Sequence, residues 1–522
     1  MTEESTARSL LENIRPVIFP SFMQAFPEKK LPLSILFIPV FSLLGYLAAN
    51  SAFFTQPYQE IGDYAANALQ ILKAGQFQET LGAYSRFVVN HPGPITFYYL
   101  SWMEKIFFFV KSPHGAHSIG IVLYNLGLLL VSLKILYSRT EDNRSSVFLL
   151  IALLIGLIPL LPGAFSNIWS PGVILFPTLL FLLALADFTG GSIRNFFWLT
   201  LSANLIVQNQ IVGISFVFPL LAIGIFYFYK SYGFAEYKSK EFLIIVFCSI
   251  AFTIVCWLPP LLEEFSHSPG NITKVLTLAL KNSTVHKIGP TLSYVLSYYT
   301  ASFSFLKEFP ALLVVGVFFG IPLFGKDRLQ EFDKRLLTVL FWAFGLTLFG
   351  GFKMKGGQIS HIYWFTYIIA ALLYYLNIKV FFAKIEFPSN RSFYWYFAVL
   401  SFLCFAFYGK NQEFKYDDRV DKFVEAISPQ KENKYRILWK SNEKDFKQGD
   451  IGIGIVLKLA REGYSSCLNE EWHFLVRDAF RCSDSEPAHT IILETPDTES
   501  ETFQTISKDS FVYKSTALRM TK

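Results

Sequence analysis

The chain has 522 residues, of which 52% are hydrophobic, 17% aromatic and only 16% charged, and its formal net charge is +6. A soluble domain typically carries about 25% charged residues, so this chain lacks the charge that a soluble surface of its size would need. The composition excludes a disordered protein, a collagen and a disulfide scaffold, and it argues against an ordinary cytosolic enzyme.

The charged residues divide the chain into two parts. From Lys410 to Lys522, 38 of 113 residues are charged, whereas only 48 of the preceding 409 residues are. The first share is typical of a water-soluble domain and the second of a membrane protein with many spans. We therefore predict a transmembrane domain over 1–409 and a soluble domain over 410–522.

The first part contains eleven apolar runs that we interpret as membrane-spanning helices. A span needs about 20 mostly apolar residues, because hydrocarbon cannot satisfy bare backbone groups. No cleavable signal peptide is visible before the first run. The predicted spans are 31–52, 115–137, 146–162, 171–187, 196–212, 213–229, 242–261, 308–325, 336–350, 359–381 and 392–409.

The orientation follows from the Lys and Arg residues of the loops, which are enriched on the cytoplasmic side. With the N-terminus inside, the inner segments hold 17 Lys and Arg in 81 residues, and the outer segments hold 10 in 125. We therefore expect a multi-pass membrane protein with a cytoplasmic N-terminus and a C-terminal domain outside the cytoplasm. The excess positive charge then reflects topology, and we expect no nucleic-acid partner.

The soluble part is predicted to be a small α/β domain. Strands are expected at 435–439, 473–476 and 490–493, and a helix at 450–462 that Gly463 ends. Cys467 and Cys482 are the only cysteines of this part, and they either pair as a disulfide or remain as two free thiols. We find no metal-ligand spacing here and predict no metal-binding residues.

The first outer loop, 52–114, is predicted to contain two helices on the membrane surface. Apolar residues recur at helical spacing from Asp63 to Leu72, and Gly75 follows as a stop signal. The run Asn90-His91-Pro92-Gly93-Pro94 predicts a rigid turn. An aromatic stretch from Ile95 to Val110, interrupted by Glu104-Lys105, predicts the second interfacial helix.

This layout resembles the GT-C superfamily of integral-membrane glycosyltransferases, which includes protein O-mannosyltransferases and bacterial lipid A aminoarabinose transferases. The resemblance covers the span layout and rests most sharply on Gly62-Asp63-Tyr64 and the 90–94 turn. Many mannosyltransferases have two adjacent acidic residues where this chain has Gly62-Asp63, so sugar identity and any metal requirement stay open. Further similar pieces are Trp169-Ser170-Pro171, Gln208-Asn209-Gln210, Trp257-Leu258-Pro259-Pro260 and Gly270-Asn271.

The resemblance implies a reaction in which an acceptor hydroxyl attacks a sugar on a polyprenyl phosphate, with inversion at the anomeric carbon. The acceptor needs a base, and a positioned carboxylate contributes about 10²–10⁴-fold in rate. Asp63 is the residue that we expect in this role. The alternative is that Asp63 caps the helix that follows it, and the two roles are compatible.

Seven further residues are candidate substrate ligands. A donor phosphate needs cations, and two lysines in the Gly-rich outer turn 351–357 run against the inside bias for positive charge. Each candidate also has a plain structural alternative: surface charge or snorkelling for the lysines and arginine, and a turn or packing role for the histidines. The candidates are Arg86, His91, Lys281, Lys287, Lys353, Lys355 and His361.

The leading functional hypothesis is a polyprenyl-phosphate-sugar-dependent glycosyltransferase with a lipid, glycan or protein acceptor. It would act on the periplasmic face of a bacterial inner membrane, where the C-terminal domain would also lie. We expect no certain cofactor and leave a divalent cation open. A transporter or flippase of lipid-linked sugars is the rival from another class, but it should show inverted repeats with broken helices, and no clear repeat is visible. An enzyme similar to O-antigen polymerases is the nearer alternative.

Overall fold

The computed structural model describes residues 31–521 with short gaps. Every structural statement below concerns the described residues only. The gaps are residues 86, 141, 233–239, 304, 307–308, 386–390, 412–417, 440–446, 484–487, 495–503, 508–509 and 514–515.

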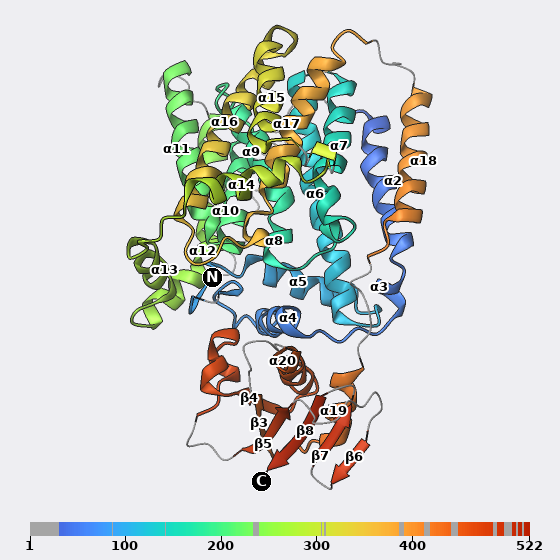
Figure 1. Cartoon of the computed structure of the whole chain (residues 1–522), viewed down its shortest axis with the longest axis vertical. Helices are drawn as coiled ribbons and strands as arrows, with labels where there is room; N and C mark the ends of the chain where they lie inside the picture. The colour runs from blue at the N-terminus through green and yellow to red at the C-terminus, as the bar shows by residue number, and fades with distance from the viewer. Residues whose placement is uncertain are drawn as a thin grey trace, which may run out of the picture.

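Helices dominate the first four-fifths of the chain and form one bundle (Figure 1). Each of the eleven predicted spans overlaps one of these helices. Six helical stretches are long and apolar enough to cross a membrane, so the count of eleven stays a prediction. The helices of the bundle are α2 (Leu33–Ala49), α6 (Pro113–Thr140), α7 (Asn143–Leu157), α9 (Leu175–Phe188), α10 (Phe196–Asn209), α11 (Val212–Tyr232), α12 (Lys240–Ser266), α14 (Ile288–Thr300), α15 (Ala311–Phe324), α16 (Glu331–Lys353), α17 (Thr366–Phe381) and α18 (Arg391–Tyr408).

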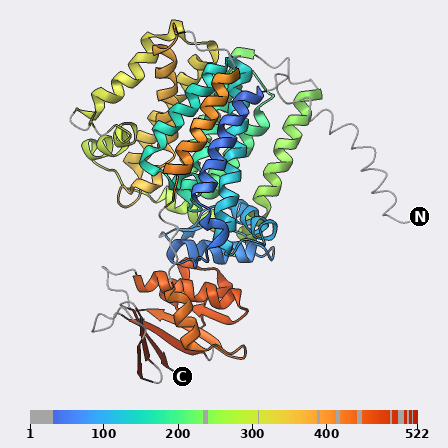
Figure 2. The ribbon, with the colours of Figure 1, turned by 90° about the vertical axis from the view of Figure 1, so that its right-hand side faces the viewer.

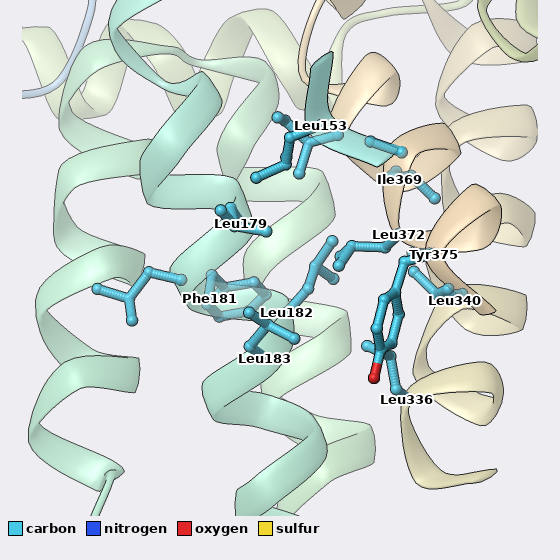
Figure 3. Close-up of a cluster of buried hydrophobic side chains, with 14 of the residues drawn as sticks. Leu153, Leu179, Phe181, Leu182, Leu183, Leu336, Leu340, Ile369, Leu372 and Tyr375 are labelled. Atoms are coloured by element: carbon cyan, nitrogen blue, oxygen red, sulfur yellow. The ribbon is translucent and has the colours of Figure 1, made fainter. Parts of the chain in front are cut away.

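Helix α9 forms the centre of the bundle, because it is apolar on all sides and every residue from Leu175 to Phe188 is buried. Helices α6, α10, α16 and α17 pack around it, and Figure 3 shows Leu182 of α9 among side chains that include Leu340 and Leu372. Helix α12 has the opposite character, since it is just as apolar but mostly exposed. Such a surface suits a lipid environment and not water.

Helix α14 corrects one detail of the predicted topology. The sequence analysis assigned 262–307 to an outer loop, but α14 enters the main core, where Val295 and Tyr299 are fully buried. The hydroxyl of Tyr374 on α17 donates to the backbone oxygen of Tyr299 at 2.6 Å. With 13 residues, α14 is too short to read as a span, which is why the sequence pattern suggested a loop.

The described parts of the predicted inner and outer segments lie at opposite ends of the bundle. At one end, the amide of Gln330 donates to the oxygen of Thr140 at 3.1 Å, and Arg328 donates to that of Val380 at 3.3 Å. The other end carries the first outer loop and the C-terminal sheet (Figures 1 and 2). The alternation of the helices therefore agrees with the prediction, while the side of the membrane that each end faces stays a prediction.

Short elements form a layer between the bundle and the C-terminal sheet (Figure 1). The two helices predicted in the first outer loop are present as α4 and α5. Trp102 of α5 and Phe108, just after its end, are largely exposed, as expected for a helix on a membrane surface. The elements of this layer are α3 (Ala52–Thr55), α4 (Gly62–Ala74), β1 (Tyr84–Ser85), β2 (Val89–Asn90), α5 (Ile95–Ile106), α8 (Ser170–Val173) and α13 (Asn271–Leu280).

The C-terminal part contains a six-stranded mixed sheet in the order β4-β3-β5-β8-β7-β6. Strands β4, β3 and β5 are parallel, and the others pair antiparallel. The predicted strand at 473–476 is wrong, because Glu470–Leu475 forms a 3-10 helix. The elements are α19 (Arg419–Ile427), β3 (Lys434–Trp439), α20 (Lys447–Arg461), β4 (Ser465–Leu468), β5 (His489–Glu494), β6 (Gln504–Ser507), β7 (Ser510–Tyr513) and β8 (Thr516–Thr521).

A disulfide crosslinks the C-terminal part, and a hydrophobic cluster attaches it to the first outer loop. Cys467 and Cys482 form a disulfide with their Cα atoms 5.1 Å apart. One hydrophobic cluster joins Ala65 and Leu69 of α4 to apolar residues of α19, α20, β3 and β5. The first outer loop and the C-terminal sheet thus share a core, and the domain boundary near 409–410 stays a prediction.

Candidate functional site

Asp63 lies in the first turn of α4 and is half-buried. The helix begins at Gly62 with Ile61 as its N-cap, and no side chain caps this described helix start. Asp63 therefore does not cap α4. Instead its carboxylate accepts a hydrogen bond from the hydroxyl of Tyr84 on β1. The hydrogen bond from Tyr84 ties this carboxylate to the β1–β2 hairpin.

A second carboxylate, Asp450 on α20, lies beside Asp63. The Oδ1 atom of Asp450 comes so close to Gly62 that a Cβ built on this glycine would lie 2.6 Å from it. Burial and the neighbouring Asp63 charge together raise the pKa of Asp450 to about 6. The sequence analysis missed Asp450, because no spacing rule relates residues so far apart in the chain. Many mannosyltransferases have a second acidic residue next to the first in sequence; in this chain Asp450 brings a second carboxylate to Asp63 through the fold.

Glu60 links the same loop to α20 through a buried ion pair. Its two carboxylate oxygens accept hydrogen bonds from the guanidinium of Arg461 at 2.6 and 2.8 Å. Burial acts to raise the pKa of Glu60, but the charge and hydrogen bonds of Arg461 outweigh it and bring this pKa to about 2. A bidentate pair of this kind fixes the two segments in one geometry.

Two histidines at the start of α6 complete this cluster. The Nδ1 atoms of His114 and His117 each lie 4.0 Å from Oε1 of Glu60. Nε2 of His117 contacts Oε1 of Glu104 at 2.7 Å. Among the described residues, Glu60, His114 and His117 are the group whose ligand atoms lie close enough to hold a metal ion. The spacing of the two histidines, one helical turn apart, is a sequence signal that could have pointed to this group.

The predicted turn around His91 is a backbone junction. The amide of Gly82 donates to the backbone oxygen of His91 at 2.9 Å, and the amide of His91 donates to that of Ala83 at 2.8 Å. The amide of Gly93 donates to the backbone oxygen of Gln208 at 3.2 Å. Nδ1 of His91 accepts from the amide of Ile211 at 3.2 Å, and burial lowers the pKa of His91 to about 4. These contacts commit one ring nitrogen of His91 to the bundle.

The hairpin β1–β2 is also fixed from the other side. The side chain of Asn271 accepts from the amide of Asn90 at 2.8 Å and donates to the oxygen of Asn90 at 3.0 Å. The amide of Asn271 in turn donates to the carboxylate of Glu263 at 2.8 Å. The sequence motif Gly270-Asn271 therefore supports the hairpin whose Tyr84 binds Asp63.

The four candidate lysines lie on two adjoining segments, because 282–286 is hydrogen-bonded to 352–354. Lys281, Lys287, Lys353 and Lys355 are all exposed. The ammonium of Lys355 lies 5.4 Å from the ring centre of Phe87, so this segment reaches the β1–β2 hairpin. Arg86, between Tyr84 and Phe87 in that hairpin, lies outside the described residues.

His361 is half-buried, and its ring lies 4.4 Å from that of Trp169. Trp169 also contacts the ring of Trp364, so the motif 169–171 packs against the segment after the lysines. Gln208, which lies against Gly93, donates to the backbone oxygen of Cys256 at 2.7 Å. The motifs singled out in the sequence thus converge at the end of the bundle nearest Asp63.

An apolar cavity of about 400 Å³ lies between α10, α11 and α12. Asn204, Thr253 and Trp257 give it a small polar part, and the indole of Trp257 donates to Asn204 at 2.7 Å. Phe218 and Ile225, both exposed, belong to its apolar lining. Its lining suits a hydrocarbon chain better than a polar ligand.

The fold and the site together define a helical membrane protein whose polar loops meet a mixed sheet at one end of the bundle. Its fold is that of ArnT from Cupriavidus metallidurans, an aminoarabinose transferase of the GT-C superfamily. The ArnT structure bound to undecaprenyl phosphate matches with a TM-score of 0.57 and 11% identity over 93% of this chain and 97% of that one. Its apo structure matches with a TM-score of 0.55 at the same identity and coverage.

The resemblance to the GT-C superfamily is thereby confirmed for the fold. Arabinosyltransferase EmbB from Mycobacterium smegmatis also matches, with a TM-score of 0.37 and 10% identity over 72% of this chain and 34% of that one, which is too low to carry an argument. No protein-family model and no curated protein matches the sequence.

Proposed function

We propose that this chain is a membrane glycosyltransferase that transfers a sugar from a polyprenyl-phosphate donor to an acceptor hydroxyl on the periplasmic face. The observation that carries the proposal is the half-buried carboxylate of Asp63. It lies at the start of α4 and accepts a hydrogen bond from Tyr84, within a fold similar to that of ArnT. The structural neighbour ArnT was solved with undecaprenyl phosphate, a donor carrier of the proposed class.

In the proposed reaction, Asp63 accepts the proton of the acceptor hydroxyl as its oxygen attacks the anomeric carbon. The new bond to the acceptor oxygen forms while the bond to the phosphate oxygen breaks, and the configuration inverts. The electron pair of the broken bond leaves with the polyprenyl phosphate, so the leaving group needs no general acid. The hydrogen bond from Tyr84 keeps the carboxylate oriented for this proton transfer.

The lysine-bearing segments supply positive charge for the donor phosphate. Lys353 and Lys355 lie next to the hairpin that contacts Asp63, and Lys281 and Lys287 lie on the segment bonded to theirs. A cation near the leaving phosphate stabilises the charge that develops on it. The apolar cavity between α10, α11 and α12 offers room for part of the lipid tail.

The periplasmic location of the site is supported by two independent features. Lys and Arg are concentrated in the segments at the opposite end of the bundle. The disulfide between Cys467 and Cys482 suits an oxidising compartment such as the periplasm. The active end and the C-terminal sheet therefore face the periplasm of a bacterial inner membrane in this proposal.

The decisive experiment replaces Asp63 by Asn and measures sugar transfer from polyprenyl-phosphate donors in membranes. Loss of the base should lower the rate about 10²–10⁴-fold. Asp327→Asn is the matched control, because Asp327 is an exposed aspartate at the other end of the bundle. Full transfer by a correctly folded Asp63→Asn enzyme would refute the assigned base, and movement of intact lipid-linked sugar without transfer would favour a flippase.

A further inference from the structure

We propose that Glu60, His114 and His117 bind a divalent transition-metal ion of the zinc class at a structural site. Glu60 precedes α4, and the two histidines lie one turn apart at the start of α6. One ligand atom from each of the three lies within 4.8 Å of the other two. Glu60 and His117 are completely buried and His114 nearly so, so this is no surface cluster of acidic groups.

The orientation of His117 points to a cation. Its Nε2 contacts the carboxylate of Glu104 at 2.7 Å, and because a carboxylate accepts, Nε2 carries the proton and Nδ1 presents a lone pair. That lone pair faces Oε1 of Glu60 at 4.0 Å. Within the described chain, Nδ1 of His117 has no hydrogen-bond partner. Two buried acceptors that face each other require a positive centre between them.

The carboxylate behind His117 matches a recurring feature of metal sites. A metal-binding histidine usually donates its other ring N–H to a carboxylate, and metal-binding carboxylates are themselves hydrogen-bonded. Glu104 provides the first of these contacts, and Arg461 provides the second by bonding both oxygens of Glu60. The ring of His114 is held by stacking on Tyr58, with ring centres 4.1 Å apart.

The charges of the cluster also favour a bound cation. Glu60 and Glu104 carry two negative charges, and Arg461, which lies 3.9 Å from Glu104 and closer to Glu60, carries one positive charge. With neutral histidines, one negative charge remains uncompensated, and although Glu104 is partly exposed, the carboxylate of Glu60 and both imidazole rings are buried, where an unpaired charge is disfavoured. A divalent ion supplies the missing positive charge.

The geometry and ligand types suit zinc. Zn²⁺ binds His nitrogen and carboxylate oxygen at about 2.0–2.2 Å, which in a tetrahedral site places ligand atoms about 3.4 Å apart. The two nitrogen–oxygen separations of 4.0 Å close to this value through small side-chain rotations. Two histidines and one carboxylate leave a fourth position for water. The ion would join the loop before Asp63 to α6, and through Arg461 to α20.

The test uses the full-length protein purified in detergent without a polyhistidine tag. Elemental analysis after dialysis against zinc chloride and then metal-free buffer should find about one Zn²⁺ per chain. In Co²⁺-loaded protein, visible absorption should show the bands of a tetrahedral site. The double variant His114→Gln, His117→Gln should lose both signals, whereas His489→Gln, a histidine of strand β5, should keep them.

Thermal unfolding separates metal loss from misfolding. A chelator should lower the melting temperature of the wild type, added Zn²⁺ should restore it, and the double variant should respond to neither. The proposal is overturned if the wild type holds no Zn²⁺ under these conditions, which would mean that a proton shared with a histidine supplies the charge. Equal metal content in the double variant would overturn it as well.

Discussion

Gly62 is the residue with the tightest steric constraint beside the candidate base. Its φ angle is +54°, a left-handed conformation that glycine adopts without strain. A side chain there would also collide with Asp450, since an added Cβ would lie 2.6 Å from Oδ1. The glycine therefore allows Asp450 to approach the start of α4. This close approach explains why glycine precedes Asp63, which the sequence motif alone did not.

The carboxylate of Asp450 makes stability depend on pH in a predictable direction. Because its pKa of about 6 lies above its ordinary value near 3.8, the folded state holds a proton that the unfolded state releases. Its favourable contribution is complete below about pH 4 and is lost as the pH rises through 6.

Replacing Asp450 by Asn should therefore raise the melting temperature at pH 7.5, by an amount equivalent to roughly 1 kcal/mol after solvent screening. The gain should shrink toward pH 5. Thermal unfolding in detergent across this pH range measures both. Asp421→Asn is the control, because it breaks a 3.2 Å ion pair with Lys458 and should not stabilise. A destabilised Asp450→Asn protein at pH 7.5 would contradict the assigned repulsion.

At the scale of elements, the β1–β2 hairpin connects the candidate base to the bundle. It binds Asp63 through Tyr84, the α10–α11 connection through His91, and the start of α13 through Asn271. With two residues per strand, the hairpin has little stability of its own. The contacts of the hairpin with neighbouring elements therefore fix the position of Tyr84.

Replacing Asn271 by Ala should remove both hydrogen bonds to Asn90 and leave two backbone groups unpaired. The expected cost is about 1–3 kcal/mol in stability, together with a loss of transfer activity, because Tyr84 no longer orients Asp63. Limited proteolysis at the hairpin and the transfer assay check the two effects. Asn433→Ala, which removes a weak surface contact of 3.3 Å to Gln430, should change neither.

The elements show which parts of this fold a sequence can predict. Long apolar runs predicted the helices well, since their length alone distinguishes them. The short helix α14 was missed for lack of length. The segment 473–476 alternates like a strand, but Nε2 of His473 contacts the oxygen of Leu468 at 2.9 Å, and the local chain closes into a 3-10 helix. Local patterns carry no information on such contacts.

The candidate site divides in the same way. Asp63 could be proposed from the sequence because the residues near it form a recognisable arrangement, and its role as the base stays a prediction. Asp450 and Arg461 could not, because they reach the site only through the packing of α20 on α4. Contacts between distant segments require the fold before they can be inferred.

At the scale of the whole molecule, the predicted orientation can be tested by labelling. The free cysteines Cys248, Cys256 and Cys404 are replaced by Ala. A single cysteine is introduced either at Ser283, in the segment bonded to the 352–354 turn, or at Lys326, in the turn that bonds the end of α17. A membrane-impermeant maleimide added to spheroplasts should label position 283 at once, and position 326 only after permeabilisation. The reverse pattern would invert the topology and place the site in the cytoplasm.

The C-terminal sheet and the first outer loop are joined by two arginine–glutamate pairs, Arg461 with Glu60 and Arg477 with Glu79, and by a shared apolar cluster. This arrangement has a consequence for biosynthesis. Helix α4 leaves the ribosome several hundred residues before α19 and α20, which cover its apolar face. The alanine-rich face of α4 therefore stays uncovered until these two helices have been translated. A chain that is made in this order brings Asp450 and Arg461 beside Asp63 and Glu60 only after α20 has packed onto α4, so a chain interrupted before α20 lacks both contacts.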